Sequence, residues 1–153
     1  MNHSLTLFSP WHIELIAGSA VARLATIAAS GAPHLVPVCF ALVEGRFAIA
    51  VDEKPKREGE LARVRNIRRD GRVTLLIDRY ADDWEQLMWV RIDGSGRILD
   101  RGDAWPEALT ALREKYPQYR SMELEGRLLI AITPLRVASW RWHEAAPPIV
   151  PPA

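Results

Sequence analysis

Short apolar runs, each of a length that suits one strand, recur along the chain between turn signals such as Ser30-Gly31, Glu44-Gly45 and Asp70-Gly71. The runs that predict strands are residues 21–28, 34–42, 46–51, 72–78, 87–99, 127–133 and 135–142. The 87–99 run is interrupted at 93–96, which predicts a hairpin or a bulge. Helices are predicted over 10–18, after the N-cap Ser9, and over 59–69 and 106–115. Many short strands with few helices between them predict a mainly β fold, arranged as an antiparallel barrel.

The run at 34–42 is apolar at both alternating sets of positions, so we expect it to be covered on both sides. Pro37 is the exception to a regular strand, because a proline has no N–H to donate to a neighbouring strand. The strand therefore lies at an edge of the sheet, contains a bulge, or leaves a gap that a bound ligand fills. The residues alone leave these alternatives open.

A cluster of cations follows the strand predicted at 46–51. Lys54, Lys56 and Arg57 surround a proline, and a helix is predicted immediately afterwards. Cations at a strand end, beside the unpaired N–H groups of a helix N-terminus, suit a bound phosphate. A solvated basic turn is the alternative interpretation. Two flanking glutamates oppose phosphate binding unless their carboxylates point to solvent.

Composition narrows the class of protein. Hydrophobic residues make up 48% of the 153 residues and charged residues 25%, as in a globular domain. We predict one domain over 1–144 and a tail over 145–153 that contains four prolines. The net charge of +1 argues against general binding of nucleic acid, and no run of about 18 apolar residues predicts a membrane span. Because no signal peptide is evident, the predicted location is cytoplasmic.

Motifs for several chemistries are absent. The single cysteine, Cys39, excludes an intrachain disulfide, and the four histidines show no ligand spacing, so no metal site is predicted. No Gly-x-Ser-x-Gly elbow, Gly-x-Gly-x-x-Gly motif or P-loop occurs, so a bound phosphate would be held by side-chain cations. Six tryptophans are many for this length and suggest a planar ligand or a subunit interface in addition to the core.

Four segments follow one another along the chain: Pro33-His34-Leu35-Val36-Pro37-Val38, Asp52-Glu53-Lys54-Pro55-Lys56-Arg57, Arg65-Asn66-Ile67 and Arg72-Val73-Thr74-Leu75-Leu76. Together they resemble the pyridoxamine 5′-phosphate oxidase-like split-barrel superfamily. Three segments further resemble a subgroup of this superfamily described as probable coenzyme F420-dependent enzymes. They are Lys54-Pro55-Lys56-Arg57, Tyr80-Ala81-Asp82-Asp83-Trp84 and Trp89-Val90-Arg91. The resemblance covers residues 9–142.

This resemblance implies a six-stranded antiparallel split β-barrel of the FMN-binding type, and a homodimer with cofactor sites at the subunit interface. It implies that cations of the 54–57 segment hold the cofactor phosphate and that the strand at 34–38 lies along the cofactor ring. Residues 51 and 52 would reach the ribityl chain, and Trp89 falls where the family places a contact from the second subunit. The residues carried over as cofactor-binding are His34, Val36, Pro37, Val38, Val51, Asp52, Lys54, Lys56, Arg57 and Trp89.

The resulting hypothesis is an F420-dependent oxidoreductase that transfers hydride between the cofactor and a small conjugated acceptor. The alternatives are an FMN-binding flavoprotein oxidoreductase of the same fold, and a non-catalytic module that binds a cofactor or haem. The C-terminal arginine motif of true pyridoxamine phosphate oxidases is not found, so that reaction is not expected. No catalytic residue is assigned, and Tyr80, His34 or solvent is the candidate proton source.

Further residues are candidates for the same site. Arg63, Arg65 and Arg68 are candidates for binding the polyglutamate tail of F420, with a solvated helix face as the alternative. Trp140 and Trp142 either wall the site or pack in the core. A nucleic-acid binder that uses the basic residues between 54 and 72 is the weakest alternative, because the net charge is near zero.

Overall fold

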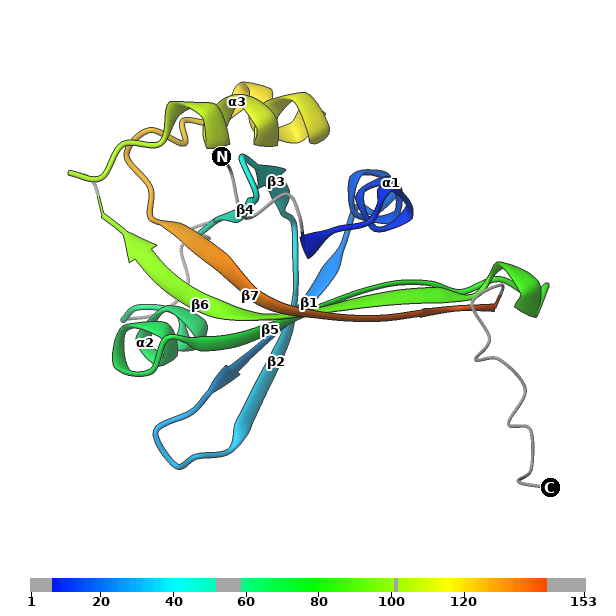
Figure 1. The fold of residues 1–153 in the computed structure, drawn as a ribbon. Coiled ribbons are helices and arrows are strands. Elements are labelled where there is room, and N and C mark those ends of the chain that lie inside the picture. Colours follow the sequence, from blue (N-terminus) through cyan, green and yellow to red (C-terminus); the bar gives the residue numbers. More distant parts are fainter. Residues whose placement is uncertain (1–6, 52–58, 101, 143–153) are drawn as a thin grey trace, which may run out of the picture.

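The computed structural model describes residues 7–51, 59–100 and 102–142. This part of the chain forms a sheet of seven strands in the order β2-β1-β5-β6-β7-β4-β3 (Figure 1). Every neighbouring pair is antiparallel. The elements are α1 Pro10–Gly18, β1 Ala22–Ile27, β2 Pro33–Val38, β3 Ala41–Val43, β4 Arg46–Ala50, α2 Ala62–Arg69, β5 Arg72–Arg79, η2 Trp84–Gln86, β6 Met88–Leu99, α3 Pro106–Lys115, η3 Pro117–Ser121 and β7 Leu129–Arg141.

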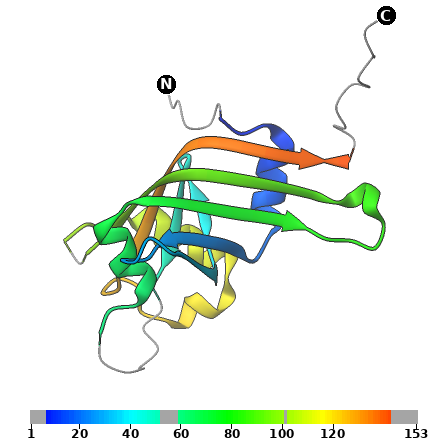
Figure 2. The same ribbon diagram turned by 90° about the horizontal axis from the view of Figure 1, so that it is seen from below.

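The predicted fold class is confirmed, because the molecule is a curled antiparallel sheet with helices packed against it (Figure 1). Figure 2 shows that β5, β6 and β7 run side by side past the helices to a tip at residues 80–87. We call this projecting part, residues 77–90 together with 139–142, the arm. The N-cap at Ser9 and the two-residue hairpin loop Glu44-Gly45 are also as predicted.

Burial alternates along the strands and so defines an inner and an outer face of the sheet. On β5, Val73, Leu75 and Ile77 are buried, and the residues between them are half-buried or exposed. The inner face packs against α1 and α2, and a second apolar cluster lies under α3. The largest buried side chains of the main cluster include Leu15, Ile16, Leu24, Phe40, Phe47, Ile49, Leu75, Ile77, Ile92 and Ile130.

The strand predicted at 34–42 is divided into β2 and β3, which lie at opposite edges of the sheet. The cause is Tyr116, which follows α3: its Oη accepts a hydrogen bond from the Phe40 backbone N at 3.0 Å and donates to Ala20 O at 2.8 Å. Because a side chain satisfies the Phe40 backbone, the strand ladder stops there and the chain crosses from one edge to the other. The sheet has seven strands, whereas the family resemblance implied six.

The strands predicted at 127–133 and 135–142 are one continuous strand, β7. Pro134 lies inside it, opposite Gly94 of β6, at the point where the register shifts. Asp93 pairs with Arg136 and Gly94 with Pro134, so Leu135 of β7 is the extra residue of a β-bulge. The bulge lets the ladder pass a residue that has no N–H. β6 itself continues through 93–96, where a hairpin or a bulge was predicted. Only a glycine fits at position 94, since a Cβ there would lie 2.6 Å from the carbonyl oxygen of Thr133.

Candidate cofactor site

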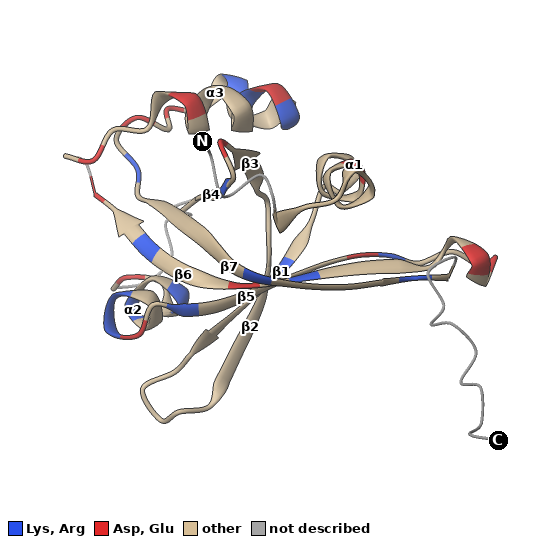
Figure 3. Ribbon diagram, in the orientation of Figure 1, with Lys and Arg blue, Asp and Glu red and all other residues tan. Residues whose placement is uncertain are grey.

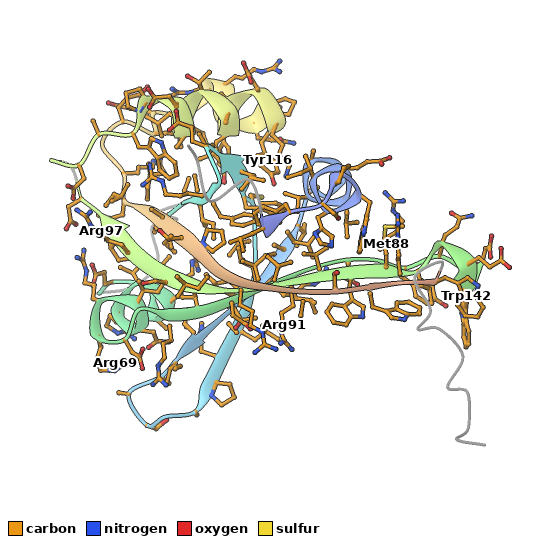
Figure 4. The ribbon with its side chains drawn as sticks, in the orientation of Figure 1. Arg69, Met88, Arg91, Arg97, Tyr116 and Trp142 are labelled. Atoms are coloured by element: carbon orange, nitrogen blue, oxygen red, sulfur yellow. The ribbon has the colours of Figure 1, made fainter. Side chains whose placement is uncertain are left out.

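The outer face of the sheet is the surface left open by the helices. Directly opposed residues of antiparallel strands point to the same face, so the ladder identifies its members. Figure 4 shows Arg91 on this side of the sheet and Met88 on the side of α1. The outer face consists of Pro33, Leu35 and Pro37 of β2, Arg23, Ala25 and Ile27 of β1, Thr74, Leu76 and Asp78 of β5, Trp89, Arg91 and Asp93 of β6, and Arg136, Ala138 and Trp140 of β7.

The predicted ring-binding strand, β2, lies at the sheet edge, which is one of the alternatives that Pro37 left open. Pro37 belongs to the outer face. His34, Val36 and Val38 point to the other side, because they are paired with the buried residues of β1 at positions 26, 24 and 22. The structure therefore separates Pro37 from the other three predicted β2 residues. The edge leaves backbone groups of β2 without a strand partner in the described part of the chain.

His34 is half-buried, and its Nδ1 is buried without a hydrogen bond partner among the residues that the structure describes. Its cross-strand neighbour Thr26 accepts a hydrogen bond from Asn66 Nδ2 of α2 at 3.0 Å. Arg69 of α2 also donates to the backbone carbonyl of Ile27, at the end of β1. These bonds place α2 beside the His34 end of β2.

The predicted phosphate cluster lies in the segment that connects β4 to α2. Asp52, Lys54, Lys56 and Arg57 are outside the described residues, so their assignment stays a prediction. Val51, immediately before them, is buried and donates its backbone N–H to Leu128 O at 3.0 Å. Val51 precedes the segment in the sequence, and α2, which lies beside His34, follows it.

Within one chain, Trp89 does not lie on the same face as His34, Val36 and Val38. It is half-buried on the outer face of the arm, opposite Trp140 of β7 and Asp78 of β5. His34 and Val36 point to the opposite face of the sheet. A cofactor that contacts both Trp89 and His34 would therefore need them from two different chains.

Two adjoining hollows on the outer face were not predicted. One, of about 410 Å³, is lined by residues that include Pro33, Thr74 and Asp93. The other, of about 340 Å³, is lined by Arg23, Ala25, Leu35, Thr74, Leu76, Asp78 and Arg91. Arg23 and Asp78 form an ion pair at 2.7 Å, and Arg91 and Asp93 form one at 3.4 Å. Alternation along each strand could have identified these residues only once the pairing of the strands was known.

The outer face exposes apolar side chains between these ion pairs. Leu35 is 65% exposed and Leu76 is 37% exposed. Exposed apolar residues grouped on one face and rimmed by charges are typical of an interaction surface. Trp140 and Trp142 are both exposed, so neither is a core residue, and Tyr80 and Trp84 are exposed near the arm tip.

Arginines of α2 already form hydrogen bonds and ion pairs with other protein groups. Arg68 binds Glu60 and Asp100, each at 2.9 Å, and the hydrogen bond that it donates to Asp100 is the main cause of the raised pKa of its guanidinium. Arg65 donates to the backbone carbonyl of Glu60. Figure 3 shows that basic residues nevertheless gather on α2. Among the residues described, no group of three His, Cys, Asp or Glu side chains could hold a metal ion. No helix in that same part is long and apolar enough to cross a membrane.

Comparison with known proteins identifies the protein family that has this fold. The model of the family described as pyridoxamine 5′-phosphate oxidase matches residues 10–141. The chain belongs to this family, and the predicted superfamily is confirmed.

Individual relatives support the same assignment. A 5a,11a-dehydrotetracycline/5a,11a-dehydrooxytetracycline reductase from Streptomyces rimosus is 28% identical over 134 residues, which cover 87% of this chain and 82% of the relative. A conserved hypothetical protein from Mycobacterium tuberculosis has a similar structure, with a TM-score of 0.71, 24% identity, and coverage of 88% of this chain and 86% of that one. The heme storage protein HutZ from Vibrio cholerae has a TM-score of 0.66, 14% identity, and coverage of 87% and 93%.

Proposed function

We propose that the protein is an oxidoreductase that binds the deazaflavin cofactor F420 and directs hydride transfer to a small conjugated acceptor. The observation that carries the proposal is the 28% identity over 87% of this chain to a relative that is named a reductase. Membership of the pyridoxamine 5′-phosphate oxidase family supports a flavin-type cofactor. The segments at 54–57, 80–84 and 89–91 favour F420 over FMN, because they resemble the F420-dependent subgroup.

The described residues fit such a cofactor. The pyrimidine edge of a flavin or deazaflavin carries carbonyl and N–H groups, and β2 offers unpaired edge backbone together with the buried Nδ1 of His34. In this proposal His34, Val36 and Val38 line the ring, Val51 and Asp52 reach the ribityl chain, and Lys54, Lys56 and Arg57 hold the phosphate. When bound, the cofactor supplies or accepts the hydride. The chain binds and orients the ring and excludes water.

The proposed active unit is a homodimer whose outer faces meet. The exposed Leu35 and Leu76, rimmed by ion pairs, suit burial against a second copy. Trp89 lies on the outer face and His34 on the opposite face, so in this dimer Trp89 would reach a cofactor bound to the other chain past the open edge of that chain's β2.

Titration of the purified protein with F420 and with FMN tests this function. We expect binding of F420 at micromolar concentration and oxidation of bound F420H2 by menadione, a conjugated quinone. Lys54→Ala/Lys56→Ala should weaken binding, because each charge-assisted hydrogen bond contributes about 1.5–3 kcal/mol. Arg120→Ala, at an exposed arginine of η3, is the control. Failure of both cofactors to bind at micromolar concentration would exclude the redox function, whereas tight binding of FMN alone would favour the flavoprotein alternative.

A haem-binding module of the same fold is the second candidate, since HutZ is named a heme storage protein. The observation that favours it is the buried, unpartnered Nδ1 of His34 in the described part of the chain; both ring nitrogens of His12 are engaged, by Ser9 N and Ser139 Oγ. His34 is therefore the candidate axial ligand. A Soret band that forms with haemin and is lost in His34→Ala would support this module, and turnover of F420H2 by the same protein would argue against it.

A further inference from the structure

A cavity of about 290 Å³ lies under α3, away from the outer face of the sheet. It is bounded by the end of β6, the first turns of α3 and the residues that precede β7 (Figure 1). Its apolar lining includes Leu99, Trp105, Leu109, Leu124 and Leu129. This volume is near the lower end of small-molecule sites, so the cavity suits a compact molecule of one or two rings.

The charged groups at the rim already have protein partners, including Arg127, whose Nε donates to the backbone carbonyl of Glu123 at 2.9 Å. The lining carboxylates of Asp100, Asp103 and Glu125 are bound by Arg68 at 2.9 Å, Arg97 at 3.3 Å and Arg113 at 2.7 Å, respectively. Arg113 also donates to the backbone carbonyl of Met122 at 3.0 Å, which holds its guanidinium in place. Because each of these charges already has a partner of opposite sign or a backbone carbonyl, the described residues of the rim offer no unpaired charge to an ionic ligand, and the rim favours a neutral one.

Trp105 carries the unsatisfied polar group of this cavity wall. Its side chain is only 6% exposed, and its Nε1 is buried without a hydrogen bond partner among the residues described. The Arg46 guanidinium covers the indole ring at 4.2 Å from the centroid and supplies no acceptor. Buried donors are rarely left unpaired in folded proteins, and such a group calls for a ligand or a water.

We propose that the cavity under α3 binds a neutral, mainly apolar molecule of one or two rings that accepts a hydrogen bond from the Trp105 indole N–H. Nε1 is closed to solvent in the free protein, so the proposal requires the indole to tilt toward the cavity when the acceptor enters. The site requires neither the cofactor nor a second copy, so it stands independently of the proposed function.

Quinoline and naphthalene are matched probes, because they have the same shape and only quinoline has a ring-nitrogen acceptor. Each is titrated into ¹⁵N-labelled protein while the six indole N–H signals are followed. We expect quinoline to shift the Trp105 indole signal and to bind roughly fivefold more tightly than naphthalene, the factor that a typical net hydrogen bond gives. Equal affinity of the two probes, or no shift at Trp105 up to millimolar quinoline, would overturn the proposal.

Two variants locate the site. Trp105→Phe removes the donor and should make the affinities for quinoline and naphthalene equal. Thr110→Trp introduces a large side chain at an exposed position that lines the cavity and should abolish binding of both probes while Trp105 is retained. Trp84→Phe, at the exposed arm tip, is the control and should change neither affinity. Undiminished quinoline binding in Thr110→Trp would place the ligand elsewhere, even if Trp105→Phe failed to fold.

Discussion

Asn66 of α2 donates a hydrogen bond to Thr26 Oγ1 of β1 at 3.0 Å, and both side chains are buried. This bond joins the helix that follows the predicted phosphate segment to the strand that pairs with His34. Asn66→Ala leaves a buried hydroxyl unpaired and should lower the free energy of unfolding by about 1–3 kcal/mol. Urea denaturation measures the loss. Arg65→Ala, at an exposed position of the same helix, is the control; equal losses in the two variants would contradict the role given to the buried bond.

Gly94 is predicted to be intolerant of any side chain. A Cβ there meets the Thr133 carbonyl oxygen at 2.6 Å, and backbone atoms of a paired strand have little room to move. Gly94→Ala should therefore destabilise the protein by about 1–3 kcal/mol, the range for overpacking. A Cβ at Gly126 meets nothing within 4 Å, so Gly126→Ala should change stability little. Thermal unfolding of both variants tests the difference, and similar midpoints would refute it.

Lys115 should make stability depend on pH. Burial lowers the pKa of its ammonium from 10.5 to about 8, although the Phe40 ring at 3.6 Å and the Ile16 carbonyl at 3.3 Å hold the charged form. Between these two values the unfolded chain binds more protons than the folded one, so stability should rise as the pH increases from about 8 toward 10.5. In Lys115→Met this rise should be absent. Unfolding curves across that window measure it, and an unchanged rise in the variant would exclude Lys115 as the cause.

Ionisation of Tyr116 should change stability in the opposite direction, at higher pH. Burial raises the pKa of its hydroxyl from 10.0 to about 12, so the folded state retains a proton that the unfolded state has lost. Stability should accordingly fall as the pH rises from about 10 to 12, and Tyr116→Phe should lack this fall. The same variant should cost about 1–3 kcal/mol at neutral pH, because Phe40 N and Ala20 O lose their partner.

Leu76 tests the proposed homodimer. Leu76→Arg adds a charge to the middle of the outer face and should raise the dissociation constant of the dimer by at least about tenfold. The measured mass should therefore shift toward that of a single chain. Multi-angle light scattering at several concentrations gives the mass. Leu61→Arg is the control, since Leu61 is 38% exposed, close to the 37% of Leu76, but lies outside the outer face. Wild-type protein that is monomeric at high concentration would refute the dimer.

Local features of the fold could be predicted from the sequence. Ser9 as an N-cap and the Glu44-Gly45 hairpin depend on neighbouring residues, and both are present. At the hairpin, Glu44 and Gly45 have φ of 50° and 79°, as a tight two-residue turn requires. The break at Phe40 could not be predicted, because its cause is Tyr116, which lies 76 residues away in the sequence.

The candidate site was predicted less completely, because the sequence does not show the register in which the strands pair. A run such as 34–42 shows that its positions alternate but not which set points outward, and the family resemblance carries both His34 and Pro37 over as cofactor-binding. The pairing of Thr26 with His34 and of Arg23 with Pro37 places them on opposite faces. The outer-face residues Arg23, Asp78 and Arg91 were missed for the same reason. The role of Lys54, Lys56 and Arg57 stays a prediction.

The position of β7 in the sheet sets the order in which the chain can fold. Among the described residues, hairpin β3–β4 pairs with no strand other than β7, and β7 follows all the other strands along the chain. During synthesis, β1, β2, β5 and β6 can associate as they leave the ribosome, while β3–β4 waits for residues 129–132. Closing that long loop is entropically slow. The nascent protein therefore exposes the apolar side of β4 until β7 has been synthesised.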